Sequence, residues 1–166
     1  MSLLATPIHS LILISMRVIE GLEELRTLVG QELGKSNWFE VTQERVNHFA
    51  EATGDHQWIH TDPERAAKES PFGTTVAHGF FTLSLCNTLT QEAFVINGTR
   101  MVVNYGLNRV RFPSPVKVGA LVRMTTDLLE IKEFQGVAQV TCKQSFEVQG
   151  ETKPCCVAET IVRLYF

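Results

Sequence analysis

The chain has 166 residues, with 15 Lys and Arg against 18 Asp and Glu and a formal net charge of −3. This length is typical of a single domain, which buries enough apolar surface to fold without a metal or disulfide staple. The slightly acidic balance, without any basic run, argues against a dedicated nucleic-acid binder, and an apolar content of 44% argues against a disordered chain.

The N-terminal segment is treated separately from the rest. Its apolar run Leu11–Ile14 is too short to span a bilayer, and no Lys or Arg precedes that run as in a secretory signal. Met16 is a candidate natural start. We therefore assign residues 1–16 to an N-terminal extension and residues 17–166 to a single domain, and we expect no association with a membrane.

The four cysteines form no CxxC motif, and they are Cys86, Cys142, Cys155 and Cys156. Most lie in apolar or alternating segments, where a thiol behaves as a small hydrophobic group. We expect them to be reduced and structural, which fits a cytoplasmic protein.

The first half of the domain, residues 17–95, is predicted to be mainly helices and loops. A short helix is expected over Ile19–Leu25 and a short strand over Trp38–Val41. Thr42 is a typical N-cap of a following surface helix, since its hydroxyl can accept a hydrogen bond from a free helical N–H. Gly54 is a typical end for that helix because glycine readily adopts positive φ.

A second helix start follows at Asp62-Pro63-Glu64, where Asp caps, Pro fills the first turn and Glu complements the helix dipole. We assign Asp62 to this cap rather than to acid catalysis. From Gly79 to Phe94 the sequence is apolar nearly all round, which predicts a helix buried on most sides. Other elements of the chain must therefore pack around that helix.

The second half is predicted to supply the wrapping sheet. Expected strands cover Met101–Tyr105, Val110–Phe112, Leu121–Ile131, Val137–Val148 and Cys155–Tyr165. The last three are long, rich in Val, Thr, Ile and Phe, and separated by turn signals. A long antiparallel sheet around one central helix is an α+β fold.

The densest polar chemistry lies between the two capped helices. Asp55 and His60 are placed on a loop there, and His78-Gly79 marks the entry to the central helix. Histidine exchanges protons near neutral pH, a nearby carboxylate can orient it or hold a water, and free N–H groups at a helix start stabilise an oxyanion. This combination suits the addition of water across a double bond conjugated to a carbonyl.

Other interpretations of these residues are weaker. His78 and Gly79 also admit structural roles, a backbone hydrogen bond and close packing. Asp55, His56, His60 and His78 could be metal ligands, but the i, i+4 histidines share a face only in a helix, and the flanking helix stop and restart argue against one. A Cys86 nucleophile would be buried and inert. No G-x-S-x-G, dinucleotide-binding or P-loop motif is present.

Three sequence blocks carry a family resemblance. Residues 49–60 contain the Gly54-Asp55 pair with His60 behind it, residues 72–79 end in His78-Gly79, and residues 104–116 contain Arg111-Phe112-Pro113-Ser114-Pro115-Val116. In this order they resemble the MaoC-like dehydratases, the (R)-specific enoyl-CoA hydratases of the hot-dog fold. The resemblance covers about residues 36–165. Gln57-Trp58 stands where many members have Asn-Pro, as in the branch of nodulation-protein-N-like chains.

The resemblance implies a single hot-dog fold, with an antiparallel sheet wrapped around a central helix and residues 42–72 as an overhanging segment. It implies reversible hydration of trans-2-enoyl-CoA to (R)-3-hydroxyacyl-CoA. Asp55 and His60 would be catalytic, and Gly79 and His78 would form the oxyanion and substrate-binding site.

The resemblance also implies partners. The substrate would be an acyl-CoA thioester, the chain would form a homodimer, and no metal or redox cofactor would be needed. Arg109, Arg111 and Lys117 flank the turn after the resembling strand and are candidates for binding the CoA phosphates. The alternatives are a hot-dog acyl-CoA thioesterase, or a protein that binds acyl-CoA without catalysis.

Overall fold

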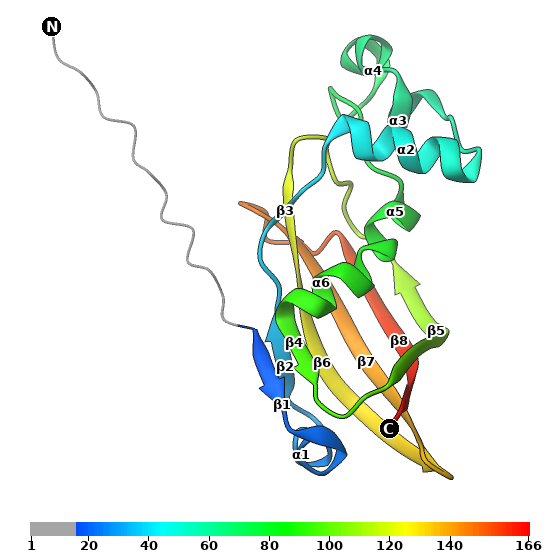
Figure 1. Cartoon of the computed structure of the whole chain (residues 1–166). Coiled ribbons are helices and arrows are strands. Elements are labelled where there is room, and N and C mark those ends of the chain that lie inside the picture. Colours follow the sequence, from blue (N-terminus) through cyan, green and yellow to red (C-terminus); the bar gives the residue numbers. More distant parts are fainter. Residues whose placement is uncertain (1–15) are drawn as a thin grey trace, which may run out of the picture.

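The computed structural model describes residues 16–166, and the rest of the proposed extension lies outside the described residues. Its largest element is one antiparallel sheet (Figure 1). The strands in spatial order are β2 (Glu32–Lys35), β6 (Leu121–Phe134), β7 (Val137–Val148), β8 (Cys156–Tyr165) and β5 (Met101–Arg111), with β3 (Phe39–Glu40) beside β6. The sequence-based α+β assignment is confirmed.

Alternation along the long strands decides which face of the sheet is buried. On β6, Val122, Met124, Thr126 and Leu128 are buried, and the residues between them are more exposed. Successive strand side chains point to opposite faces, so this period of two gives the sheet one apolar face. That face receives the central helices.

The central helix predicted for residues 79–94 is two helices, α5 (Gly79–Ser84) and α6 (Cys86–Ala93), joined at Leu85. They cross the concave face of the sheet (Figure 1). Leu85 itself has right-handed helical dihedrals. The expectation of burial on most sides is wrong for Phe80, which is 70% exposed. The reason is that only one side of the helices faces the sheet of this chain.

The core has two parts, one on each half of the helix pair. Beside α5 and the start of α6, Phe81, Leu85 and Leu89 pack with residues of β6, β7 and the Cys155–Cys156 pair. Beside the end of α6, the buried residues include Ala93 and Phe94, together with Leu33 and Leu164. The four cysteines are free thiols, and burial raises the pKa of Cys86 to about 12, which keeps that thiol protonated at neutral pH.

Three short strands escaped the sequence analysis. β1 (Arg17–Ile19) precedes α1 (Gly21–Thr27) and pairs in parallel with β4 (Phe94–Ile96). β2 pairs with β6 through a register shift between Glu32 and Gly34. Segments of three or four residues are too short to show a period, so their pairing partners alone define them as strands.

The overhanging segment holds α2 (Gln43–Thr53), α3 (Trp58–Thr61) and α4 (Pro63–Glu69) over one end of the sheet (Figure 1). The predicted caps are confirmed. The Thr42 hydroxyl accepts from the Arg45 N–H at 3.3 Å, and the Asp62 carboxylate accepts from the Arg65 N–H at 3.0 Å. Gly54 ends α2 with φ at 76°.

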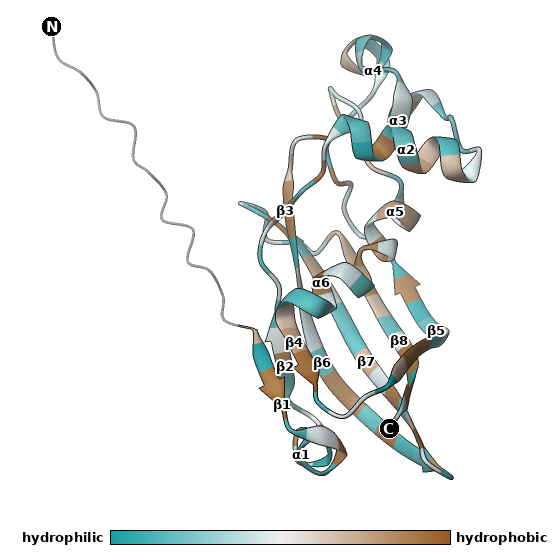
Figure 2. Cartoon of the chain, viewed as in Figure 1, coloured by the Kyte–Doolittle hydropathy of each residue, from teal (hydrophilic) through white to brown (hydrophobic). Residues whose placement is uncertain are grey.

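The strand β5 forms one edge of the sheet. Two strands were predicted there, but β5 runs continuously with register shifts between Asn104 and Gly106 and between Leu107 and Val110. Large apolar side chains along it are exposed, and apolar and polar stretches follow one another on this strand in Figure 2. Among the described residues, no helix has both the length and the apolar character needed to cross a membrane.

Candidate active site

His60 lies on α3, a single helical turn above the sheet, rather than on the loop expected from the sequence. The His60 N–H and the Gln57 carbonyl close this turn at 2.9 Å. The turn is also tied to its neighbours by Gln43, whose Nε2 donates to the His60 carbonyl at 2.7 Å and whose Oε1 accepts from the Thr75 hydroxyl at 2.5 Å. Nothing in the sequence marked Gln43, since its role depends on residues distant in the chain.

The protonation of the His60 ring follows from its hydrogen bond. Nδ1 lies 2.6 Å from the Val76 carbonyl oxygen. A carbonyl oxygen can only accept, so Nδ1 carries the hydrogen and Nε2 of the neutral ring keeps a free lone pair. The buried His60 side chain therefore presents one basic nitrogen in a fixed orientation.

Asp55 follows the glycine that ends α2. Its Oδ1 accepts weakly from the Gln57 N–H at 3.4 Å, and its side chain is 54% exposed. One oxygen is thus turned toward the backbone of the next segment, while the carboxylate remains open to water. This placement leaves Asp55 able to bind a small polar molecule beside His60.

His78 completes the cluster from the N-cap position of α5. Its Nε2 donates to the Asp55 carbonyl at 2.9 Å and lies 4.0 Å from the Asp55 Oδ2. Its ring stacks on the His60 ring with centroids 3.8 Å apart. The His78 Nδ1 is buried and finds no hydrogen-bond partner among residues 16–166. His78 therefore fixes the Asp55 backbone against the His60 ring.

Asp55, His60 and His78 each offer one ligand atom, and these atoms lie within 4.8 Å of one another. Two nitrogens and one carboxylate oxygen are a donor set that zinc accepts. A metal bound through His78 Nε2 would have to displace the hydrogen bond that this nitrogen donates to the Asp55 carbonyl. His56, the other candidate ligand, points elsewhere and lies 3.8 Å from Glu51.

The surroundings of His60 favour its neutral form. Burial lowers the pKa of His60 below its usual value, and the neighbouring His78 lowers it further. The hydrogen bond to Val76 and the charge of Asp55 act in the opposite direction but do not compensate fully. The ring is therefore an unprotonated base at neutral pH.

This lowered pKa predicts how stability depends on pH. The unfolded chain binds a proton at His60 below about pH 6.5, while the folded chain resists protonation. The free energy of unfolding should therefore fall as the pH drops below about 6.5, and it should be independent of His60 above that pH. Urea unfolding of the wild type and His60→Gln between about pH 8 and pH 5 measures this. Parallel curves for the two proteins would contradict it, and His56→Gln serves as the control.

Gly79 is the first residue of α5, so its N–H has no partner inside the helix. A Cβ at this position would lie 2.9 Å from the Phe112 ring. The packing role considered for Gly79 is thus real, and it brings the backbone N–H beside a groove of about 260 Å³ that Phe112 and Pro113 also line.

The contact with Phe112 predicts the effect of Gly79→Ala. The methyl group should push the ring aside and lower both stability and activity, by about 1–3 kcal/mol of unfolding free energy. The double variant Gly79→Ala/Phe112→Ala keeps the N–H and removes the clash, so it should be no less stable than Phe112→Ala alone. Thermal unfolding of the three variants decides this, and a further loss in the double variant would show that another contact excludes the methyl group.

The three basic candidates lie in different surroundings. Lys117 is exposed, and its backbone forms an isolated antiparallel bridge with Val76. The Val76 carbonyl accepts the hydrogen bond from the His60 ring. Arg111 ends β5 next to Phe112, and its Nη1 donates to the Val110 carbonyl at 2.7 Å. Arg109 is 3.9 Å from Glu159, which offsets part of its charge. Lys117 is thus the candidate whose backbone contacts the segment that holds His60.

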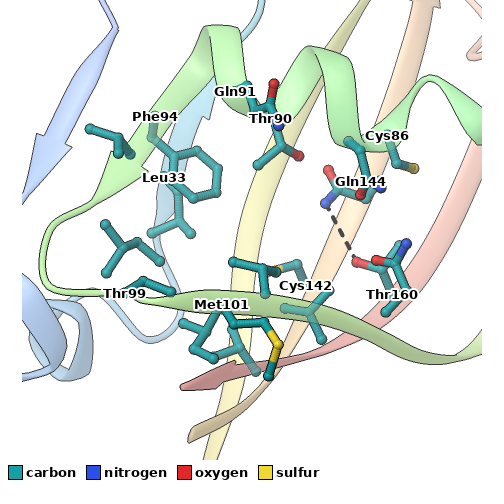
Figure 3. Close-up of a pocket in the computed structure, with 18 of the residues that line it drawn as sticks. Leu33, Cys86, Thr90, Gln91, Phe94, Thr99, Met101, Cys142, Gln144 and Thr160 are labelled. Atoms are coloured by element: carbon teal, nitrogen blue, oxygen red, sulfur yellow. Dashed lines mark hydrogen bonds between the residues drawn. The ribbon is translucent and has the colours of Figure 1, made fainter. Parts of the chain in front are cut away.

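A cavity of about 320 Å³ lies between α6 and the sheet (Figure 3). Its walls come from α6, β4, β5, β7 and β8, and most of them are apolar. Phe94 and Leu33 lie at one end in Figure 3, with Cys86, Gln144 and Thr160 at the other. A second hollow, a groove of about 370 Å³, adjoins the latter end and is lined by Leu83 and Ser84 of α5.

The model of the "MaoC like domain" family matches residues 24–149. The chain belongs to the MaoC-like dehydratase family. It is 51% identical over 149 residues to 3-hydroxyacyl-thioester dehydratase Z of Mycobacterium tuberculosis, which covers 89% of this chain and 98% of the relative. It is 45% identical over 149 residues to Nodulation protein N of Rhizobium leguminosarum bv. viciae, with 88% and 92% covered.

The (R)-hydratase from A. caviae involved in PHA biosynthesis is one of the similar solved structures. Its TM-score is 0.65 at 23% identity, with 81% of this chain and 94% of that chain covered. This MaoC-like chain therefore has the hot-dog fold that the sequence resemblance implied. The family match also includes all the residues of the cluster and the three basic candidates.

Proposed function

We propose that this MaoC-like protein catalyses the reversible addition of water to a trans-2-enoyl-CoA, giving an (R)-3-hydroxyacyl-CoA. The observation that carries the proposal is the His60 Nε2 lone pair, fixed by the Nδ1 bond to Val76 and placed beside the Asp55 carboxylate. The relative named a 3-hydroxyacyl-thioester dehydratase supports the same reaction in the reverse direction. The side chains can account for each proton.

In the hydration direction, the neutral His60 takes a proton from a water molecule held by the Asp55 carboxylate. The water oxygen forms a bond to C3 as the C2–C3 double bond opens, and electron density moves to the thioester oxygen. His60 then returns its proton to C2 as the carbonyl re-forms. One water is consumed, and no redox change occurs. The lowered pKa of His60 keeps the ring unprotonated at neutral pH, so it can take the first proton.

The Gly79 N–H would stabilise the oxygen that gathers charge. As the first residue of α5 it has no hydrogen-bond partner within the helix, and Gly79 lines the groove. His78 would act as a positioning residue, since its hydrogen bond holds the Asp55 backbone and its ring supports His60. The acyl chain would follow α5 and α6 into the apolar cavity, and Arg111 and Lys117, with Arg109 farther out, would meet the CoA phosphates.

Crotonyl-CoA provides the direct test. Loss of the conjugated-enoyl absorbance without release of free thiol means hydration, and chiral analysis of the product should give the (R) isomer. Release of free thiol would instead support a thioesterase, and binding without either change would support a non-catalytic acyl-CoA-binding protein. Activity that EDTA abolishes and zinc restores would replace the proton-transfer scheme with a metal site at the same three residues.

We also propose that two copies associate through β5. This strand leaves one edge of the sheet unpaired, and Val102, Tyr105 and Leu107 on it are each about half exposed. Phe80 and Phe112 extend the apolar surface and contact each other with ring centroids 6.0 Å apart. Exposed edges and large apolar patches are normally covered by a partner. A second copy pairing along β5 would cover both.

Light scattering should therefore give twice the mass of one chain. Val102 is 58% exposed on the edge strand, so Val102→Glu should bury a charge in the interface and shift the mass toward the monomer at micromolar concentration. The matched control is Val29→Glu, because Val29 is 45% exposed but lies outside β5. A wild-type monomer, or equal masses for the two variants, would contradict this interface.

A further inference from the structure

Several polar side chains gather at one place on the wall of the mostly apolar cavity. The residues that line both the cavity and the neighbouring groove are Cys86, Asn87, Asn104 and Thr160. Gln144 reaches the same place from β7 and hydrogen-bonds with Thr160 (Figure 3). We call Asn87, Asn104, Gln144 and Thr160 the polar junction. They come from α6, β5, β7 and β8, so the fold brings them together rather than the sequence.

The hydrogen bonds at the junction have a direction. The Thr126 hydroxyl donates to the Gln144 Oε1 at 2.7 Å, and the Gln144 Nε2 donates to the Thr160 hydroxyl oxygen at 3.4 Å. Thr126 is fully buried, and Gln144 and Thr160 are at most 9% exposed. A hydroxyl has one hydrogen to donate, and the Thr160 hydroxyl, which here only accepts, has no acceptor for it in the described part of the chain. The series therefore ends in a free donor at the cavity wall.

A buried hydrogen-bond donor without an acceptor costs free energy, so a ligand that supplies an acceptor there is favoured. The Thr99 Oγ1 is also buried without a hydrogen-bond partner in the described chain, but it lies at the other end of the cavity, near Leu33 and away from the junction (Figure 3). If Gln144 were only a buried structural residue, its hydrogen bonds with Thr126 and Thr160 would be sufficient. That role does not account for a Thr160 hydroxyl that faces the cavity with its hydrogen free.

The junction lies partway along the path expected for an acyl chain. Gly79 begins α5, the groove is lined by Leu83 and Ser84 of the same helix, and the cavity reaches Phe94 beyond the end of α6. At 1.5 Å per helical residue, Asn87 is roughly 12 Å from Gly79 along the axis. Beyond the junction the walls are mostly apolar, with Val140, Val162 and Leu164 among their residues. A ligand that fits these walls has a polar group partway along its chain and an apolar end.

We propose that the polar junction binds an oxygen atom carried mid-chain by the acyl group, a ketone or hydroxyl that accepts a hydrogen bond from Thr160. The proposal rests on the proposed hydratase function for the direction of the chain. An amide carbonyl of the CoA arm has the same hydrogen-bonding chemistry. The apolar end of the cavity favours the acyl group, since the CoA arm leads to a charged nucleotide that requires solvent or basic residues.

The test compares trans-2-hexadecenoyl-CoA, whose chain is long enough to pass the junction, with analogues of it in which one mid-chain methylene is replaced by a ketone carbonyl. At the matching position, the wild type should prefer the ketone in kcat/KM. Thr160→Val keeps the shape of the side chain and removes the donor, so it should lower kcat/KM for that ketone about tenfold and raise it about twofold for the plain chain. Thr141→Val is the control, because Thr141 lies on the opposite face of β7.

Thr126→Val tests the series itself. Thr126 does not line the cavity and can act only through Gln144, so it is a positioning residue. Its substitution should lower the preference for the ketone in the wild type and have no further effect on that preference in the Thr160→Val background. An equal effect in both backgrounds would mean that Thr126 contributes only to general packing.

Two outcomes overturn the proposal. In the first, no ketone position is preferred by the wild type. In the second, Thr160→Val weakens plain and ketone substrates equally, which would place Thr160 against the shared CoA arm. If no thioester is hydrated at all, the proposed reaction fails, and calorimetry with hexadecanoyl-CoA and its mid-chain keto analogues decides the junction alone. Tighter ketone binding that Thr160→Val abolishes would support it, and equal binding would overturn it.

Discussion

Replacing His60 with Gln should lower kcat/KM for crotonyl-CoA hydration by about 10² to 10⁴, the range typical of a positioned proton-transfer group. Gln can still donate a hydrogen bond to the Val76 carbonyl, but it cannot take a proton from water. The effect should appear mainly in kcat, because the proton moves in the transition state rather than in the bound substrate. The measurement is steady-state kinetics on a variant whose circular dichroism shows the native fold.

His56→Gln is the matched control for His60→Gln. His56 is half exposed, lies 3.8 Å from Glu51 and is outside the Asp55, His60 and His78 cluster. It should keep activity within about twofold of the wild type, as expected for an exposed residue without a catalytic contact. A folded His60→Gln variant with near-native turnover would rule out the mechanism, and equal losses in both variants would point to a general disturbance of α3.

Asp55→Asn should also lower kcat/KM by about 10² or more. Asn keeps the size of the side chain and the weak hydrogen bond with the Gln57 N–H, but it loses the charge that holds water and supports a protonated His60 during the reaction. The control is Asp62→Asn, because Asn caps a helix as well as Asp does, so α4 should begin as before. Normal activity in Asp55→Asn would leave His60 without its proposed partner.

The double variant Asp55→Asn/His60→Gln tests whether the two residues act in the same step of the reaction or in different steps. Groups that act on one transition state lose much less together than the product of their single losses. We therefore expect the double variant to be about as slow as the slower single variant. Fully multiplicative losses would mean that the two residues serve different steps, such as substrate binding and proton transfer.

Local sequence signals predicted the parts of the fold that depend on neighbouring residues. Thr42, Gly54 and Asp62 act as predicted, because a cap or a left-handed turn is decided by contacts within a few residues. The long strands β6, β7 and β8 were also predicted, since each is long enough to show its alternation. The pattern of Asp55, His60 and His78-Gly79 led to the family that the domain match then showed.

Other elements required long-range contacts. α3 is one turn held in place by Gln43 and by Val76, which are far from it in the sequence, so the segment carried no helical signal of its own. The two expected strands over residues 101–112 merge because β8 pairs along their whole length and absorbs the irregularities as register shifts. The exposure of Phe80 depends on which side of α5 faces the sheet.

The sequence by itself determined the α+β class, the capped helices, the family resemblance and the residue types that could carry proton transfer. Only the tertiary structure decided which nitrogen of His60 is basic, that His78 supports Asp55 through its backbone, and that Gln144 and Thr160 meet at the cavity wall. The physical reason is range. Capping and alternation act within a few residues, whereas a tautomer, a lowered pKa and a cavity wall depend on groups that only folding brings into contact.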